Sequence, residues 1–158
     1  MRTIKGGWVD PKSLPTGPNG KALCRWCGIE VAGRRRTFCS DQCVHEHRVR
    51  SDPSYVRLEL RKRDKGVCAE CGTDCDSLRR RARKMALKER SRFLKTLVEE
   101  MGWPRAVCNL RRSWWDADHI LPVVEGGGLC GLENYRTLCL KCHRQATAEL
   151  QARRREAS

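Results

Sequence analysis

The spacing of apolar residues predicts a series of short helices. Ser40 is a typical helix N-cap, so we expect a short helix to begin at Asp41. Val56 and Leu60 lie four residues apart and follow a Ser-Asp-Pro tripeptide, which is a common helix start. The pattern therefore predicts a second helix over about 53–64.

A longer helical pattern covers residues 76–101, as one helix or as two. Its second half has apolar residues on one face, at Leu94, Leu97, Val98 and Met101. A Gly-Trp-Pro tripeptide then ends the pattern, because glycine and proline both disfavour helix continuation. Basic residues crowd the first half, which indicates either a solvated helix face or a contact with nucleic acid.

Two short strand patterns follow, at Ser113–Asp118 and Tyr135–Leu138. A loop that contains three consecutive glycines separates them. Residues after His143 fit a helix that ends in a basic tail, 153–155. The order strand, loop, strand, helix, with further helices upstream, predicts an α+β fold.

Composition divides the chain into three segments. Residues 1–22 are rich in Gly and Pro and predict a flexible N-terminal arm. Residues 23–52 hold a first group of cysteines and predict a small zinc module. Residues 53–158 hold a second group and the inserted basic helical segment, about 76–101, and predict the main domain.

The composition leaves limited apolar area for a core. Charged residues make up 33% of the chain and aromatic residues only 6%, so we expect additional staples, for which the eleven cysteines are candidates. The formal net charge of +14 favours polyanions as partners, nucleic acid above all. A generally basic protein without such a partner is the alternative.

The expected environment of the chain is reducing. No run of residues is apolar enough to span a membrane, and the first residues lack the apolar middle of a signal peptide. A cytoplasmic or nucleoid-associated location follows as an expectation. In such a compartment, Cys-x-x-Cys pairs bind metal more often than they form disulfides.

The first cysteine group has the spacing of a zinc site. Two close pairs on either side of a short loop supply four thiolates, Cys24, Cys27, Cys39 and Cys43. His45 or His47 could replace Cys43 as the fourth ligand. We interpret the group as a structural clip, and the arginines at 34–36 on its loop as candidate phosphate contacts.

The second cysteine group joins two distant pairs, Cys68 and Cys71 with Cys139 and Cys142. A zinc ion bound by all four would close a long loop and contribute directly to folding. Cys75 lies close enough in sequence to replace one ligand. We assign no role to the remaining cysteines, which are typical small apolar fillers.

Four polar residues near this group are not needed by a zinc site: Asp118, His119, Asn134 and His143. Phosphodiester cleavage does need such residues. It requires a base to deprotonate water, for which a neutral imidazole suits, and a cation to stabilise developing negative charge. A carboxylate and an imidazole can hold that cation, and an amide can hold a loop or the base in place.

The expected geometry constrains the first strand. Neighbouring strand residues point to opposite faces, so Asp118 and His119 can share one site only if the strand ends or bulges there. Pro122 and the glycines that follow fit an abrupt exit. His143 would lie in the first turn of the last helix, where the zinc clip positions it. Asp116 is expected to be solvated or ion-paired, and the adjacent tryptophans to lie in the core.

These motifs together resemble the HNH, or ββα-metal, endonuclease family. The chain resembles in particular the zinc-stapled HNH domain of annealing helicases that carry a RAN-binding-type zinc finger. Six segments carry this resemblance: CRWCG, RRTFCSDQC, RSDPSYVRLEL, GVCAEC, DHILPVVEGGG and TLCLKCH. The resemblance covers residues 23–150. It implies a small zinc-stapled α+β domain with a ββα-metal core, additional helices and an N-terminal four-cysteine zinc module.

The resemblance also implies a role for each site residue. His119 corresponds to the general base, and Asn134 to the residue that orients the loop and the base. Asp118 and His143 correspond to the ligands of one catalytic Mg²⁺ or Mn²⁺ ion. Cys68, Cys71, Cys139 and Cys142 correspond to the ligands of one structural Zn²⁺ ion. With the first cysteine group, the chain is expected to bind two structural Zn²⁺ ions.

The expected function is therefore a divalent-metal-dependent endonuclease that nicks or fully cleaves DNA. The alternative is a non-catalytic, zinc-stapled module that binds DNA or RNA as an adaptor. Expected partners are nucleic acid, DNA before RNA, and as a further candidate a helicase or other protein, but no membrane. The candidate nucleic-acid contacts are Arg34, Arg35, Arg36, Arg79, Arg80, Arg81, Arg83, Lys84, Lys141 and Arg144.

Overall fold

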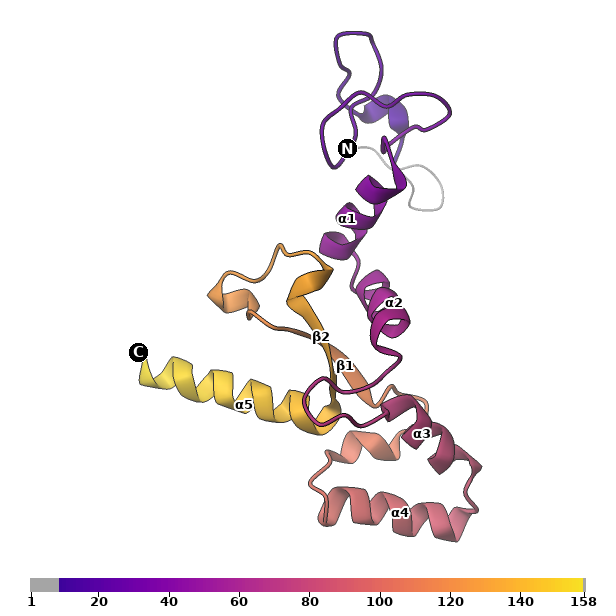
Figure 1. Cartoon of the computed structure of the whole chain (residues 1–158), viewed down its shortest axis with the longest axis vertical. Helices are drawn as coiled ribbons and strands as arrows, with labels where there is room; N and C mark the ends of the chain where they lie inside the picture. The colour runs from indigo at the N-terminus through magenta and orange to yellow at the C-terminus, as the bar shows by residue number, and fades with distance from the viewer. Residues whose placement is uncertain (1–8, 158) are drawn as a thin grey trace. The chain divides into compact units, whose positions relative to one another are not determined.

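The structure is a computed structural model that describes residues 9–157, in two compact units (Figure 1). The first unit ends at Tyr55 and the second begins at Val56. The α+β class predicted from the sequence is confirmed, because helices surround a small sheet in the second unit. In the described part of the chain, no helix is long and apolar enough to cross a membrane.

Where the structure describes it, the first unit consists mainly of turns together with the helix α1 (Asp41–Ser51). Ser40 caps α1 as predicted, since its Oγ accepts a hydrogen bond of 3.1 Å from the backbone N–H of Cys43. Buried Cys24, Val31 and Cys43 form its small core, against which Phe38 and Cys39 pack. A core this small agrees with the expectation that the module needs a staple.

The segment predicted as a flexible arm makes specific contacts where the structure describes it. A short 3-10 helix, η1, spans Pro11–Ser13, and Thr16 pairs with Ala22 in an isolated β-bridge. The side chain of Glu30 accepts hydrogen bonds from the backbone and side chain of Asn19, at 2.8 and 2.7 Å. Residues 1–8 of the predicted arm lie outside the described part, and the arm's flexibility stays a prediction.

The second unit contains a two-stranded antiparallel sheet among helices. Its elements are α2 (Pro53–Asp64, which begins at the end of the first unit), α3 (Cys75–Lys84), α4 (Leu87–Glu99), η2 (Arg105–Cys108), β1 (Trp115–His119), η3 (Val123–Glu125), η4 (Leu132–Asn134), β2 (Tyr135–Cys139) and α5 (Leu140–Glu156). The register pairs Trp115 with Cys139 and His119 with Tyr135. The last helix, α5, contacts both strands, which completes a ββα unit (Figure 1).

The predicted elements match the observed ones closely. The helix expected over 53–64 is α2, and the segment 76–101 divides into two helices. The first strand begins two residues later than expected and includes His119. The last helix begins at Leu140, so His143 lies in its first turn as expected, and Cys139 caps it: its Sγ accepts from the N–H of Cys142.

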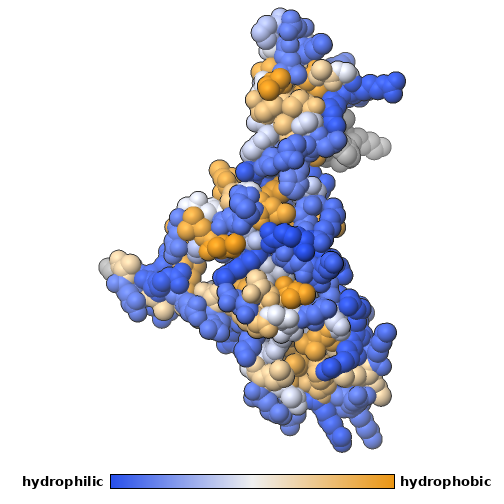
Figure 2. All heavy atoms as spheres, in the orientation of Figure 1, coloured by the Kyte–Doolittle hydropathy of each residue, from blue (hydrophilic) through white to orange (hydrophobic). Residues whose placement is uncertain are grey.

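The core of the second unit lies around Trp114. This side chain is fully buried, and Trp115 is nearly so, which confirms both as core residues. The Trp114 ring lies 6.1 Å from that of Trp103, in a tilted arrangement. Leu97 from α4 and Leu138 from β2 are also buried, so α4 and the sheet both contribute to the apolar interior. Outside it, most of the face seen in Figure 2 is hydrophilic, with scattered apolar patches.

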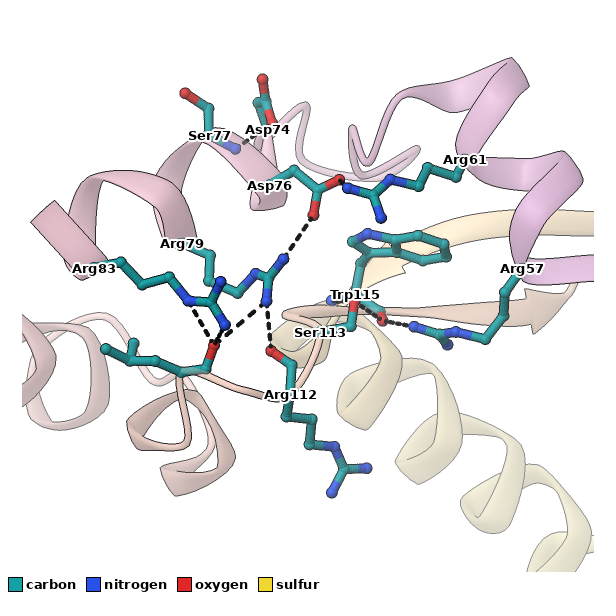
Figure 3. A network of polar contacts seen from close by, with 11 residues as sticks. Arg57, Arg61, Asp74, Asp76, Ser77, Arg79, Arg83, Arg112, Ser113 and Trp115 are labelled. Carbon is teal, nitrogen blue, oxygen red and sulfur yellow. Dashed lines mark hydrogen bonds and ion pairs between the residues drawn. The ribbon is translucent and has the colours of Figure 1, made fainter. Parts of the chain in front are cut away.

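A network of arginines ties α3 to its surroundings (Figure 3). Asp76, only 5% exposed, pairs with Arg61 at 3.1 Å and with Arg79 at 3.8 Å. The guanidinium of Arg79 also donates to the carbonyls of Leu110 and Arg112, at 3.4 and 3.5 Å. These contacts join the inserted helices to α2 and to the segment that leads into β1.

The Asp76→Ala substitution should destabilise the second unit. It removes a carboxylate that compensates the partly buried guanidinium of Arg79, whereas Arg61 is solvated enough to lose little. We expect a loss of about 2 kcal/mol in the free energy of unfolding, measured by urea denaturation. As the control, Glu99→Gln affects a solvated pair with Lys95 and should change stability by less than about 0.5 kcal/mol. Equal losses in the two variants would contradict a stabilising role for the network.

Candidate metal and catalytic site

Two clusters of four cysteines are present among the described residues: Cys24, Cys27, Cys39 and Cys43 in the first unit, and Cys68, Cys71, Cys139 and Cys142 in the second. In each cluster, the four Sγ atoms all lie within 4.8 Å of one another. Four thiolates at the usual Zn–S distance of about 2.3 Å would be about 3.8 Å apart in a tetrahedron. The clusters are therefore consistent with two zinc sites.

The structure resolves the alternatives that the spacing left open in the first cluster. Cys43 lies 3.4 Å from Cys39, Sγ to Sγ, and takes the fourth position. His45 and His47 are engaged elsewhere. The Nδ1 atom of His45 lies 2.9 Å from the hydroxyl of Tyr55, and the ring of His47 packs on Phe38.

The second cluster joins the end of β2 and the first turn of α5 to the segment before α3. Its Cys71 and Cys139 are 68 residues apart in sequence, yet their Sγ atoms lie 3.8 Å apart. The N–H of Ala69 donates to the carbonyl of Thr137 at 2.8 Å, which holds the two halves together. Cys75 is not a member of the cluster: it is fully buried, its thiol donates to Thr73 O, and burial raises its pKa.

Local environments act differently on the thiols of the clusters. Burial acts to raise the pKa of Cys24, but nearby backbone N–H groups outweigh it and lower the pKa to about 6. Burial likewise opposes ionisation of Cys71, and hydrogen bonds from Thr73 lower its pKa to about 7. Burial raises the pKa of Cys139 to about 11. Four closely spaced thiols cannot all ionise unless a cation compensates their negative charge. A bound zinc ion would supply that positive charge.

Two carboxylates of β1 flank the imidazole of His143. Asp116 and Asp118 are two residues apart on the strand and therefore point to the same face. The Nε2 atom of His143 lies 3.7 Å from Asp118 Oδ1, and its Nδ1 atom lies 3.7 Å from Asp116 Oδ2. His143 reaches this position from the first turn of α5, as the sequence predicted.

Asp118 and His143 fit the ligand set of a single divalent cation. Two ligand atoms that share an ion at the usual distance of about 2.1 Å can be at most about 4.2 Å apart, and these two are closer. The carboxylate suits a hard cation such as Mg²⁺ or Mn²⁺, whereas the imidazole is a more usual ligand of softer first-row metals. The second oxygen of Asp118 accepts from Arg136 Nε at 3.0 Å, which leaves Oδ1 directed at His143.

His119 ends β1 without a bulge. Its regular pairing with Tyr135 sends its side chain to the face opposite Asp118, and the two rings lie 4.3 Å apart. The Nε2 atom of His119 is buried and has no hydrogen-bond partner among the described residues. Such an unsatisfied polar atom is uncommon in a side chain with only a structural role. Asp118 and His119 can both line one cleft because the strand ends at His119. A strand end was one of the two geometries expected from the sequence, the other being a bulge.

Asn134 holds the loop that leaves the strand. Its Oδ1 accepts from the N–H of Leu121 at 2.7 Å, and its Nδ2 donates to the carbonyls of Leu121 and Gly127, at 3.0 and 3.2 Å. Gly127 is required at this point because a Cβ there would overlap Leu121 O and lie 2.8 Å from Asn134 Nδ2. The amide thus positions the loop, while the structure gives it no direct contact with the His119 ring.

A cleft of about 220 Å³ opens beside these residues. Asp118, His119 and Arg136 line it from the sheet, and Thr147 and Leu150 from α5. The cleft therefore brings the predicted base and one predicted cation ligand to a common solvent-filled space. The other predicted ligand, His143, does not line the cleft, but its Nε2 atom lies 3.7 Å from Asp118 Oδ1.

The basic residues predicted to contact nucleic acid fall into two groups. Arg79 and Arg83 are engaged within the protein, because both donate to the carbonyl of Leu110 (Figure 3). They fit a structural role better than the predicted phosphate contact. Arg35 pairs with Asp41, and Arg81 stacks on the ring of Phe93. The remaining predicted contacts are exposed: Arg34, Arg36, Arg80, Lys84, Lys141 and Arg144.

Sequence reasoning missed the arginines that hold the site's carboxylates. Arg136 is opposite Asp118 in the strand register, and Arg57 from α2 pairs with Asp116 at 3.0 Å. Aligning the two predicted strands as a hairpin could have found Arg136. No local signal identifies Arg57, since it lies 59 residues from its partner.

Comparisons with known proteins agree with this geometry. The HNH endonuclease family model matches residues 107–149. The DNA annealing helicase and endonuclease ZRANB3 of Mus musculus is 37% identical over 144 residues, which cover 82% of this chain and 14% of that protein. The Homo sapiens ZRANB3 is 35% identical over 116 residues, 70% of this chain and 11% of that protein.

The likeness extends to three dimensions. The crystal structure of the human ZRANB3 HNH domain matches with a TM-score of 0.52 and 32% identity, over 66% of this chain and 97% of that domain. The chain belongs to the HNH endonuclease family, and the family model covers β1, β2 and the first part of α5. It spans about a seventh, at most, of the ZRANB3 proteins that it matches.

Elemental analysis should find two zinc ions per chain after exposure to a moderate chelator. Cys27→Ser and Cys71→Ser each break one cluster, and each variant should retain one ion because three thiolates hold zinc less tightly than four. Cys108→Ser is the matched control, since this exposed cysteine belongs to neither cluster. Two ions in all four proteins, or fewer than two in the wild type, would contradict the assignment.

Proposed function

We propose that this chain is a divalent-metal-dependent endonuclease that hydrolyses DNA phosphodiester bonds, by nicking or by double-strand cleavage. One observation carries the proposal: Asp118 and His143 meet at 3.7 Å beside a cleft that His119 also lines. The two zinc-type clusters are complete without any of these residues. Membership of the HNH endonuclease family supports the same chemistry.

His119 is the proposed general base. Of its two ring nitrogens, Nε2 is buried, so Nδ1 is the atom that can face a water molecule in the cleft. There it would take a proton from the water that attacks phosphorus. The contact with the Tyr135 ring and the end of the strand keep the imidazole at the edge of the cleft.

Asp118 and His143 are the proposed ligands of the catalytic cation. A Mg²⁺ or Mn²⁺ ion bound there would supply positive charge to the phosphate as negative charge develops on its oxygens. Arg136 fixes the carboxylate of Asp118 from the opposite strand. Asn134 holds the connecting loop closed below the cleft, so that His119 and Asp118 keep their positions.

The second cysteine cluster is proposed to hold structural zinc and to position His143. Cys139 ends β2 and caps α5, while Cys142 immediately precedes His143. A bound Zn²⁺ ion would therefore hold the first turn of α5 against the sheet. We propose that the first cluster holds a second zinc ion, which stiffens the N-terminal unit.

DNA is the proposed substrate, within a reducing compartment. The net charge of +14 and the exposed basic side chains favour a polyanion. The ZRANB3 relatives are called DNA annealing helicases and endonucleases, which supports DNA before RNA and a helicase as a candidate partner. A specific observation also favours a second function, DNA or RNA binding without cleavage: Lys141 and Arg144 are exposed on the first turn of α5.

Plasmid nicking separates the two functions. Wild-type protein should convert supercoiled plasmid to nicked or linear DNA with Mg²⁺ or Mn²⁺, and His119→Ala should be about 10²- to 10⁴-fold slower because it lacks the base. Zinc content should be unchanged, and the variant should remain folded despite the lost packing on Tyr135. Glu99→Gln, on the solvated face of α4, is the control. If the wild type cuts no faster than His119→Ala, the nuclease proposal fails and the binding function remains.

Salt dependence tests the contact with phosphates. The slope of log affinity against log salt should be steep for a DNA duplex, and replacing both Lys141 and Arg144 with Gln should reduce it by roughly 1 to 2. Lys62→Gln removes a charge that already pairs with Glu59, so its slope should match the wild type. Identical slopes in all three proteins would remove the first turn of α5 from the DNA contact.

A further inference from the structure

We propose that Asp116, held by Arg57, is a positioning residue that orients His143 toward the catalytic cation. The inference deepens the proposed function and rests on the cation site assigned there. Neither residue is among the four to which the HNH resemblance gives a role in the site, which are Asp118, His119, Asn134 and His143. The interaction spans α2, β1 and α5, all within the second unit.

Arg57 is fixed by three separate contacts. Its Nη1 donates to Asp116 Oδ1 at 3.0 Å, and its Nη2 donates to the carbonyl of Trp115 at 2.9 Å. Its guanidinium carbon also lies 4.4 Å from the centre of the Trp115 ring, over its face. Figure 3 shows the side chain reaching from α2 to the carbonyl at the start of β1. A planar group held at both ends and on one face has little freedom to move.

Asp116 therefore has one oxygen for Arg57 and one for His143. Oδ1 accepts the charged hydrogen bond from Arg57, and Oδ2 lies 3.7 Å from His143 Nδ1. The 3.7 Å separation exceeds the length of a hydrogen bond, yet a carboxylate on this side of the ring favours the tautomer with its proton on Nδ1 and the lone pair on Nε2, the nitrogen that faces Asp118. Metal-binding histidines commonly depend on a carboxylate at the other ring nitrogen in this way, because it fixes both the tautomer and the ring plane.

The arrangement also explains why the two carboxylates of β1 have different roles. Each is paired with one arginine, Asp116 with Arg57 and Asp118 with Arg136. His143 lies between them with one nitrogen toward each. Because a single imidazole nitrogen coordinates a cation, the carboxylate at the other nitrogen orients the ring and is not a third ligand at that position.

Binding of Mn²⁺ to the zinc-loaded full chain tests the proposal without relying on cleavage. The loss of the six-line electron paramagnetic resonance signal of free Mn²⁺ reports binding, and Asp118→Ala defines the background from other sites. Asp116→Ala should weaken the Asp118-dependent affinity by about 10- to 100-fold. Asp116→Asn should weaken it less, because the amide oxygen can still accept from Nδ1–H. Glu99→Gln should bind as the wild type does.

Cleavage provides the second measurement. In Asp116→Ala, the Mn²⁺ concentration for half-maximal nicking should rise in parallel with the dissociation constant, and saturating Mn²⁺ should restore most of the rate. A structural role alone would lower zinc content or unfolding temperature and would not be relieved by Mn²⁺. If Asp116→Ala does not fold, Asp116→Asn and Arg57→Gln decide the question by the same measurements.

The outcomes separate this inference from the proposed nuclease function. Unchanged Mn²⁺ affinity in folded Asp116→Ala, or a wild type without Asp118-dependent Mn²⁺ binding, overturns the inference. Weakened Mn²⁺ binding together with a wild type that cuts no DNA supports the inference and overturns only the nuclease function. Weakened binding and a matching shift in the nicking curve support both.

Discussion

The organisation of the second unit depends on the four-cysteine cluster that joins its beginning to its end. Cys68 and Cys71 precede α3, whereas Cys139 ends β2 and Cys142 lies in the first turn of α5. A chain with so few aromatic residues has little apolar area with which to hold these segments together. The cluster brings these segments together through four closely spaced thiols. The residue after its last cysteine is His143. A zinc-type cysteine and the proposed cation ligand thus share one helical turn.

Much of the fold could be predicted because its signals are local. Ser40, the Ser-Asp-Pro start of α2 and the two strand patterns act within a few residues, and the structure contains the elements that they predict. The exact first residue of α5 has no usual sequence signal, because Cys139 caps the helix through its sulfur, whereas helix starts are recognised by an oxygen at that position. The contacts of residues 9–22 were missed because they depend on distant partners such as Glu30.

The parts of the candidate site that form short sequence motifs could be predicted. The two sets of four cysteines were assigned from spacing, and the structure confirms that each set gathers in space. The roles of Asp118, His119, Asn134 and His143 stay predictions, although their positions are compatible with them. Arg57 and Arg136 were not found because pairing across the fold decides what they contact. The same limit explains why Arg79 and Arg83 were predicted to contact phosphate. Their positive charge is visible in the sequence, but only the fold shows that both donate hydrogen bonds to a backbone carbonyl.

The long span of the second cluster has a consequence for the order of events as the chain is made. Cys71 must wait for Cys139, 68 residues later, before the two can share an ion. The helices α3 and α4 lie entirely within that interval and contact each other, so both have been synthesised before the partner cysteines are made. His143 follows the last cysteine directly. The nuclease-type site therefore cannot assemble on a partly synthesised chain, and any cleavage activity would begin only after the structural staple can close.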